Sequence, residues 1–60
     1  MTTNEIKVGD HYRCNMTGVV VRVVESNRIL IRFEATDKTG EAFVTPMLTE
    51  LFAANFSYFS

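Results

Sequence analysis

The sequence predicts a single, mostly β domain, a small five-stranded barrel with a short helical turn before its last strand. Three observations support this prediction. The chain has 60 residues, of which 47% are hydrophobic and 22% charged, a composition typical of one globular domain. Runs rich in β-branched residues alternate with short turns of glycine, asparagine and aspartate. Near the C-terminus, a proline is followed by apolar residues at helical spacing.

The first two strands are expected on either side of a glycine turn. Residues 1–5 are polar and unpatterned, and we expect them to form a flexible arm of a domain that spans residues 1–60. His11–Cys14 follows a turn signal and is predicted as the first strand. Gly18 then opens residues 19–25, whose density of valine predicts the second strand.

The third strand is predicted over residues 28–36, where apolar and polar side chains alternate. A turn at residues 37–40 leads into a fourth strand over residues 41–45. The expected core face of the second and third strands consists of Val19, Val21, Val23, Ile29, Ile31, Phe33 and Ala35. Two consecutive hairpins of this kind form a meander.

The loop between the second and third strands fixes their expected register. Residues facing each other must share one side of the sheet, so the loop needs an odd number of residues. Residues 26–28 meet this condition, with Asn27 in the left-handed conformation. Arg22 would then lie directly opposite Arg32 on the outer face, with Glu34 diagonal to both.

The helical turn is expected to begin at Thr45 as N-cap, with Pro46 in the first helical position. Asn55 can end it, and residues 56–60 would add a last strand. The apolar residues at helical spacing are Met47, Leu48, Leu51 and Phe52. This order of elements is that of an SH3-like barrel, and an OB-like barrel is the alternative that usually needs a longer chain.

Composition limits the chemistry that the chain can support. The formal net charge is −1, whereas a dedicated nucleic-acid binder is usually basic on one face. Cys14 is the only cysteine, so no internal disulfide is expected, and with His11 as the only histidine neither a structural zinc site nor any other cofactor is predicted. Cys14 is expected to be a small buried hydrophobe. No signal peptide or apolar run of membrane-spanning length is seen, which predicts a cytoplasmic protein.

No catalytic set is recognised, and the candidate partner-binding residues are three arginines and three aromatics. The arginines could receive a phosphate or carboxylate from a partner, because the guanidinium group suits such paired contacts. Most C-terminal aromatics are expected in the core, with at least one left exposed as a contact surface, for example in a homodimer. The candidates are Arg22, Arg28, Arg32, Phe43, Tyr58 and Phe59.

Several spaced residues resemble short proteins of unknown function encoded by enterobacterial phages and prophages. They comprise Val-Gly-Asp-His-Tyr-Arg at residues 8–13, Gly-Val-Val-Val at residues 18–21, Thr-Pro at residues 45–46, Phe52 and Phe56. The resemblance spans most of the chain. It implies a phage accessory protein acting inside a bacterial cell, and it carries over no active site.

The chain is also similar to the plasmid-borne, trimethoprim-insensitive dihydrofolate reductases. The similarity consists of Gly9-Asp10 near the start and Pro46 after the fourth strand. That family has an SH3-like fold and forms its active pore in a tetramer, with binding residues on a Val-Gln-Ile-Tyr strand. Residues 42–45 here read Ala-Phe-Val-Thr, which lacks the Gln and Tyr. This departure makes an oligomeric enzyme with a shared pore the least favoured hypothesis.

The sequence therefore favours a non-enzymatic protein-interaction module that binds a host or phage protein. The alternative is a nucleic-acid-binding accessory protein, whose basic and aromatic strip would consist of Tyr12, Arg13, Arg22, Arg28, Arg32 and Phe43.

Overall fold

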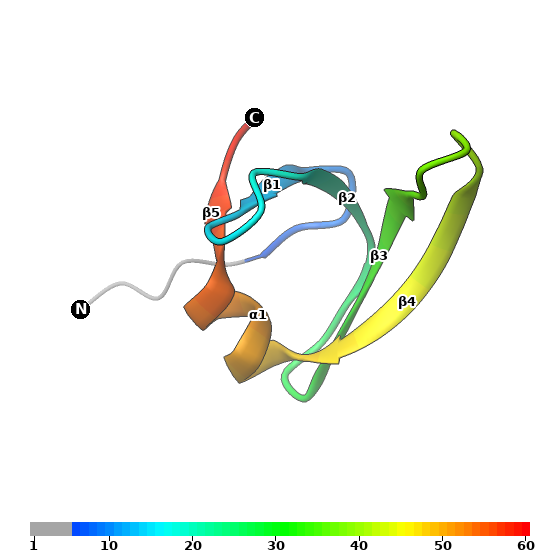
Figure 1. The fold of residues 1–60 in the computed structure, drawn as a ribbon. Coiled ribbons are helices and arrows are strands. Elements are labelled where there is room, and N and C mark those ends of the chain that lie inside the picture. The colour runs from blue at the N-terminus through cyan, green and yellow to red at the C-terminus, as the bar shows by residue number, and fades with distance from the viewer. Residues whose placement is uncertain (1–5) are drawn as a thin grey trace.

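A computed structural model describes residues 6–60, and the expected arm at residues 1–5 lies outside this range. Five antiparallel strands form one curved sheet in the order β4-β3-β2-β1-β5 (Figure 1). One short helix precedes the last strand. The elements are β1 (His11–Cys14), β2 (Val20–Ser26), β3 (Leu30–Thr36), β4 (Ala42–Leu48), α1 (Thr49–Asn55) and β5 (Phe56–Tyr58). The predicted fold class, a mostly β SH3-like barrel, is confirmed.

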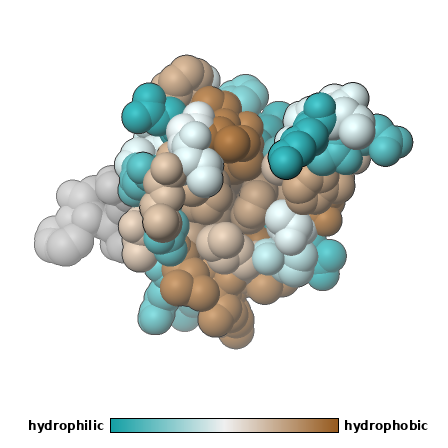
Figure 2. Space-filling view, viewed as in Figure 1, coloured by the Kyte–Doolittle hydropathy of each residue, from teal (hydrophilic) through white to brown (hydrophobic). Residues whose placement is uncertain are grey.

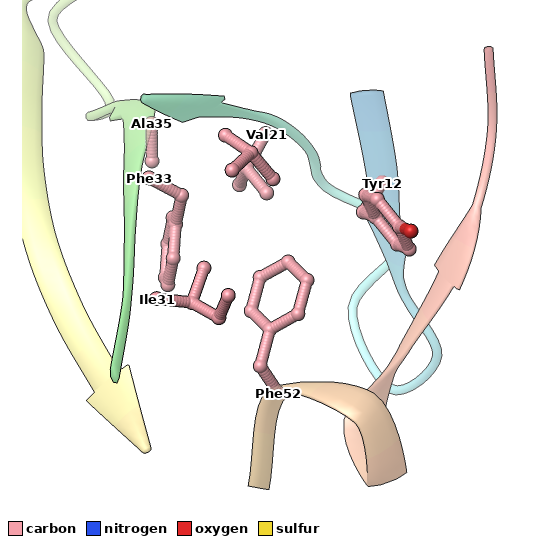
Figure 3. Packing of buried hydrophobic residues seen from close by; sticks show 7 residues of the cluster. Tyr12, Val21, Ile31, Phe33, Ala35 and Phe52 are labelled. Carbon is pink, nitrogen blue, oxygen red and sulfur yellow. The ribbon is translucent and has the colours of Figure 1, made fainter. Parts of the chain in front are cut away.

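The core lies on the concave side of the sheet, where α1 closes the open end (Figure 3). Phe52 of α1 is fully buried, and its ring stacks on Phe56 with the centroids 4.3 Å apart. It also lies 5.2 Å from the ring of Tyr12 and 5.4 Å from that of Phe33. The remaining buried side chains are Val21, Val23, Ile31 and Ala35. Phe52 therefore contacts both β1 and β3 across the concave face of the sheet.

Two residues expected in this core lie outside it. Val19 and Ile29 are both exposed, although they continue the alternation of their predicted strands. Val19 precedes the first paired residue of β2, and Ile29 precedes the first paired residue of β3. Their carbonyls still accept hydrogen bonds from Cys14 and Thr49, but both residues lie at strand ends beyond the buried cluster, so their side chains remain exposed.

The register between β2 and β3 differs from the predicted one. Arg22 lies opposite Glu34, and Arg32 lies opposite Glu25, with a register shift between Val23 and Glu25. The pairing already differs next to the loop, where Ser26 of β2 lies opposite Ile31, so the loop is not the predicted residues 26–28. One extra residue in β2 at the shift, a β-bulge, changes the pairing once more. The predicted pair of Arg22 opposite Arg32 is therefore wrong.

The loop that joins β2 and β3 is held by the side chain of Asn27. Its Oδ1 accepts hydrogen bonds from the N–H groups of Ile29 at 2.8 Å and Leu30 at 2.7 Å. Within residues 6–60 no residue other than glycine has a positive φ, so the left-handed Asn27 that we predicted is wrong. An Asx turn, in which the Asn27 side chain accepts hydrogen bonds from the backbone, reverses the chain direction here without a left-handed residue.

The turn between β3 and β4 lies where it was predicted. Asp37 Oδ1 accepts hydrogen bonds from the Thr39 N–H at 2.9 Å, the Thr39 hydroxyl at 2.6 Å and the Glu41 N–H at 3.0 Å. The Thr39 hydroxyl contributes most to holding the pKa of Asp37 below its usual value, and the Glu41 N–H adds to it. Gly40 supplies the positive φ of +89° that the turn requires.

The helix begins later in the chain than predicted. Thr45 and Pro46 belong to β4, opposite Phe33 and Arg32, and α1 begins only at Thr49. A proline is tolerated in an edge strand when its missing N–H would point away from the neighbouring strand. The Thr49 hydroxyl donates to the Asn27 carbonyl at 2.9 Å, which ties the helix start to the β2–β3 loop. The helix ends at Asn55, as predicted.

Candidate interaction surface

The two sheet arginines are each paired with a carboxylate on the outer face. Arg22 Nη2 lies 3.1 Å from Glu34 Oε1, and Arg32 Nε lies 3.3 Å from Glu25 Oε1. Their side chains are about half exposed, so these pairs contribute little to stability. A phosphate or carboxylate from a partner would have to compete with Glu34 and Glu25 for these guanidinium groups.

Arg28 has a different environment. It lies exposed in the β2–β3 loop, beside Ile29, and makes no salt bridge with any other residue of the described part of the chain. Of the three candidate arginines, Arg28 therefore has the guanidinium group that is most available to an external anion.

The candidate aromatic residues lie on the two edges of the sheet. Tyr58 and Phe59 are exposed at the β5 edge, where the Tyr58 ring meets the edge of Tyr12 at 5.7 Å. Phe43 is exposed on β4, the opposite edge, facing Ala35 of β3. Of the four C-terminal aromatics expected mostly in the core, only Phe52 is buried and Phe56 is partly buried.

The six candidate residues therefore do not form one surface, and the predicted nucleic-acid strip is interrupted. Tyr12 is buried in the core, where burial, followed by the nearby charge of Asp10, raises the pKa of its hydroxyl. Its ring cannot stack on a base without leaving the core. Arg22 and Arg32 offer the strip little free charge because each is paired with a glutamate.

An apolar surface that the sequence analysis did not identify lies where the β2–β3 loop meets the junction of β4 and α1. Ile29 is 72% exposed, Leu48 53% and Leu51 51%. Leu30 lies directly opposite Leu48, and the Thr49 N–H donates to the Ile29 carbonyl at 2.9 Å. Figure 2 shows hydrophobic residues at this lower end of the molecule. We call Ile29, Leu30, Leu48 and Leu51 the apolar end.

The apolar end was missed because each of its residues has an ordinary structural explanation in the sequence. Ile29 continues a strand alternation, while Leu48 and Leu51 match the apolar face of a helix. No local pattern shows that a loop residue and a helix residue lie side by side. That proximity results from the Thr49 hydrogen bonds to the β2–β3 loop.

Groups that could support a reaction are few among residues 6–60. Cys14 is only partly buried, so its predicted burial is wrong, and a hydrogen bond with the Thr17 side chain is the main cause that lowers the pKa of its thiol. His11 Nδ1 lies 3.5 Å from Ser60 Oγ, a contact at the limit of a hydrogen bond. No group of three or more His, Cys, Asp or Glu side chains is placed to hold a metal ion in the described residues.

No helix within residues 6–60 is long and apolar enough to cross a membrane. Comparison of the chain with protein-family models, curated proteins and solved structures found no match.

Proposed function

We propose that this chain is a non-enzymatic protein-interaction module that binds a partner protein through the apolar end, with Arg28 at its rim. The observation that supports the proposal is that three large aliphatic side chains of the apolar end are exposed, one each from the loop, β4 and α1. Leu30, partly buried, lies directly opposite Leu48, and the Thr49 N–H bond to the Ile29 carbonyl holds the start of α1 against the loop. Contiguous exposed apolar residues on a small domain are typical of contact surfaces. Arginine is enriched in such interfaces, which fits the place of Arg28 beside Ile29.

The exposed fractions indicate what the partner must provide. Full burial of one large aliphatic side chain is worth about 1.5–3 kcal/mol, so covering the exposed fractions of Ile29, Leu48 and Leu51 contributes about 3–5 kcal/mol. Micromolar affinity requires about 8 kcal/mol. The remainder has to come from Arg28 and from polar contacts around the rim. The partner is therefore expected to present an apolar segment next to a carboxylate or phosphate group.

The resemblance to phage and prophage proteins supports a proposal about the source of the partner. A phage accessory protein acts inside a bacterial cell, so the partner is proposed to be a host or phage protein. Bacterial lysate is then the appropriate source in which to search for it.

The test is capture from bacterial lysate with the purified, immobilised protein, followed by mass spectrometry. Ile29→Ser should remove the partner, because it deletes the most exposed side chain of the apolar end and leaves the backbone carbonyl that accepts from Thr49. Arg28→Ala should weaken capture. Tyr58→Ser, an exposed residue at the opposite edge of the sheet, is the matched control and should leave capture unchanged.

A partner that is retained equally by Ile29→Ser and the unaltered protein would contradict the proposal. So would a partner lost only with Tyr58→Ser. Recovery that disappears after nuclease treatment and falls steeply with salt would favour the nucleic-acid alternative instead, because phosphate contacts give that salt dependence.

A further inference from the structure

The β4 edge of the sheet is long and carries no charge. β4 and β5 are the two edge strands, and β5 has only three residues whereas β4 has seven. The β4 sequence, Ala-Phe-Val-Thr-Pro-Met-Leu, contains no charged side chain. Edge strands in soluble domains are usually protected by charges, short length or covering elements. Among residues 6–60, Pro46 is the one such protection at this edge, which makes β4 the strand most suited to pair with another chain.

Two backbone hydrogen bonds at the ends of the β3–β4 pair determine which β4 groups point away from β3. The Asp37 N–H donates to the Glu41 carbonyl at 2.9 Å, and the Thr49 N–H donates to the Ile29 carbonyl at 2.9 Å. In an antiparallel pair, residues bonded to the neighbour alternate with residues whose N–H and C=O point outward. The odd-numbered positions therefore bond to β3. The outward-pointing residues are Ala42, Val44, Pro46 and Leu48.

We propose that β4 pairs antiparallel with β4 of a second copy of this chain, about a two-fold axis at Thr45. In this register Ala42 lies opposite the partner's Leu48, and Val44 lies opposite the partner's Pro46. Each proline removes one donor, so about six of the eight possible backbone hydrogen bonds form. A register centred on Pro46 would place the two prolines together and lose the central bonds. The Thr45 register keeps all four outward-pointing residues paired.

The side chains in this register also match. On the concave side, Phe43, which is 46% exposed, faces the partner's Met47, and a thioether next to an aromatic ring is a favourable contact. Thr45 faces the partner's Thr45 at the axis. On the outer side, Val44 and Leu48, each 53% exposed, face the partner's Pro46 and Ala42. No like charges oppose each other along the paired segment, because charged residues lie only beyond its ends.

The interface area favours a second copy and limits the affinity. The seven-residue edge and its half-exposed apolar side chains cover on the order of 500 Å² in each copy, about 1,000 Å² in total, which is the lower limit for a specific interface. A self-complementary strand reaches this total because the same patch is used twice. The dimer should therefore be weak and depend on concentration.

The dimer is independent of the proposed function and would change how that function works. Ile29 and Leu51 lie beyond the paired segment and stay accessible in each copy, whereas Leu48 belongs to both surfaces. Antiparallel pairing places the two apolar ends at opposite ends of β4, about 20 Å apart at the usual rise per strand residue. A bivalent module of this kind would bind a repeated partner more tightly than a monomer does.

The first test is the solution mass over a wide range of protein concentration, by sedimentation or light scattering. The mass should rise from monomer toward dimer as the concentration rises. Val44→Lys should keep the chain monomeric, because it places two like charges diagonally across the axis on the exposed outer side. Its circular dichroism spectrum should match that of the unaltered protein. A monomer mass at every concentration would overturn the proposal and leave the edge free for a strand of another protein.

The second test checks the register by crosslinking. In a Cys14→Ser background, Thr45→Cys places two thiols opposite each other in a pair with Cα atoms about 4.5–5.5 Å apart, within the range for a disulfide. Met47→Cys is the matched control, because its thiols would lie four positions apart. Oxidation should crosslink the first variant and spare the second. Equal crosslinking of both variants, or of neither, would overturn the register.

The two proposals fail separately. A dimer that is lost with Leu51→Ser but kept with Val44→Lys would refute the β4 interface and move dimerisation to the apolar end. Val44→Lys that remains monomeric and still captures the lysate partner would support the β4 dimer without affecting the proposed function.

Discussion

Replacing Phe52 by leucine tests whether this one side chain holds the fold together. Phe52 is fully buried and contacts the rings of Tyr12, Phe33 and Phe56 at 5.2, 5.4 and 4.3 Å. Each aromatic pair is worth about 0.5–1.5 kcal/mol beyond the buried area. Leucine keeps an apolar group but loses these ring contacts, and we expect the free energy of unfolding to fall by about 2 kcal/mol.

This loss is large for a chain of 60 residues. Natural domains have about 0.05–0.15 kcal/mol of stability per residue, which gives roughly 3–9 kcal/mol here. For domains of this size, 1 kcal/mol corresponds to about 4–8 °C in Tm, so Phe52→Leu should lower Tm by about 8–16 °C. Phe52→Ala, expected to cost about 3–5 kcal/mol, could leave the chain unfolded and is less informative.

The measurement is thermal and urea unfolding followed by circular dichroism. The matched control is Leu51→Ala, one residue away on the same helix but half exposed. It should change the free energy of unfolding by no more than about 0.5 kcal/mol, because exposed positions outside special contacts rarely change it more. Equal shifts for the two variants, or an unchanged Tm for Phe52→Leu, would refute the assignment of Phe52 to the centre of the core.

Two further predictions concern the sheet and its turn. A double-mutant cycle of Arg22→Ala and Glu34→Ala should give a favourable coupling below about 1 kcal/mol, since the pair is exposed. A cycle of Arg22→Ala with Arg32→Ala should give no coupling. A repulsive coupling between the two arginines would instead support the predicted register, in which Arg22 lies opposite Arg32. Asp37→Asn should be less stable than the unaltered protein at neutral pH. Because hydrogen bonds from Thr39 hold the folded-state pKa of Asp37 below its usual value, its stabilisation is complete above the unfolded pKa and is lost as pH falls through the folded pKa. Urea unfolding from pH 7 to pH 2 should show the two proteins converging in the acid range, and a constant difference would contradict this role of the carboxylate.

Local pattern determined the elements and most of the core of this protein. The alternation along residues 28–36 placed Ile31, Phe33 and Ala35 in the core, because a paired strand sends successive side chains to opposite faces. The turn at residues 37–40 could be predicted because aspartate accepts backbone hydrogen bonds in such turns and glycine adopts their positive φ. Of the candidate site, the sequence predicted only that at least one C-terminal aromatic side chain is exposed, and Tyr58 and Phe59 both are.

Tertiary structure decided the register, the length of β4 and the apolar end. The bulge between Val23 and Glu25 depends on how two strands fit against each other, and neither strand shows it alone. Pro46 fits a helix start and an edge strand equally well, and only the empty side of β4 makes the strand possible. The contact of Thr49 with Asn27 spans 22 positions in sequence and holds the start of α1 against the β2–β3 loop. Long-range contacts of this kind leave no periodic trace in the chain, so the surface proposed to bind a partner emerged only from the folded arrangement.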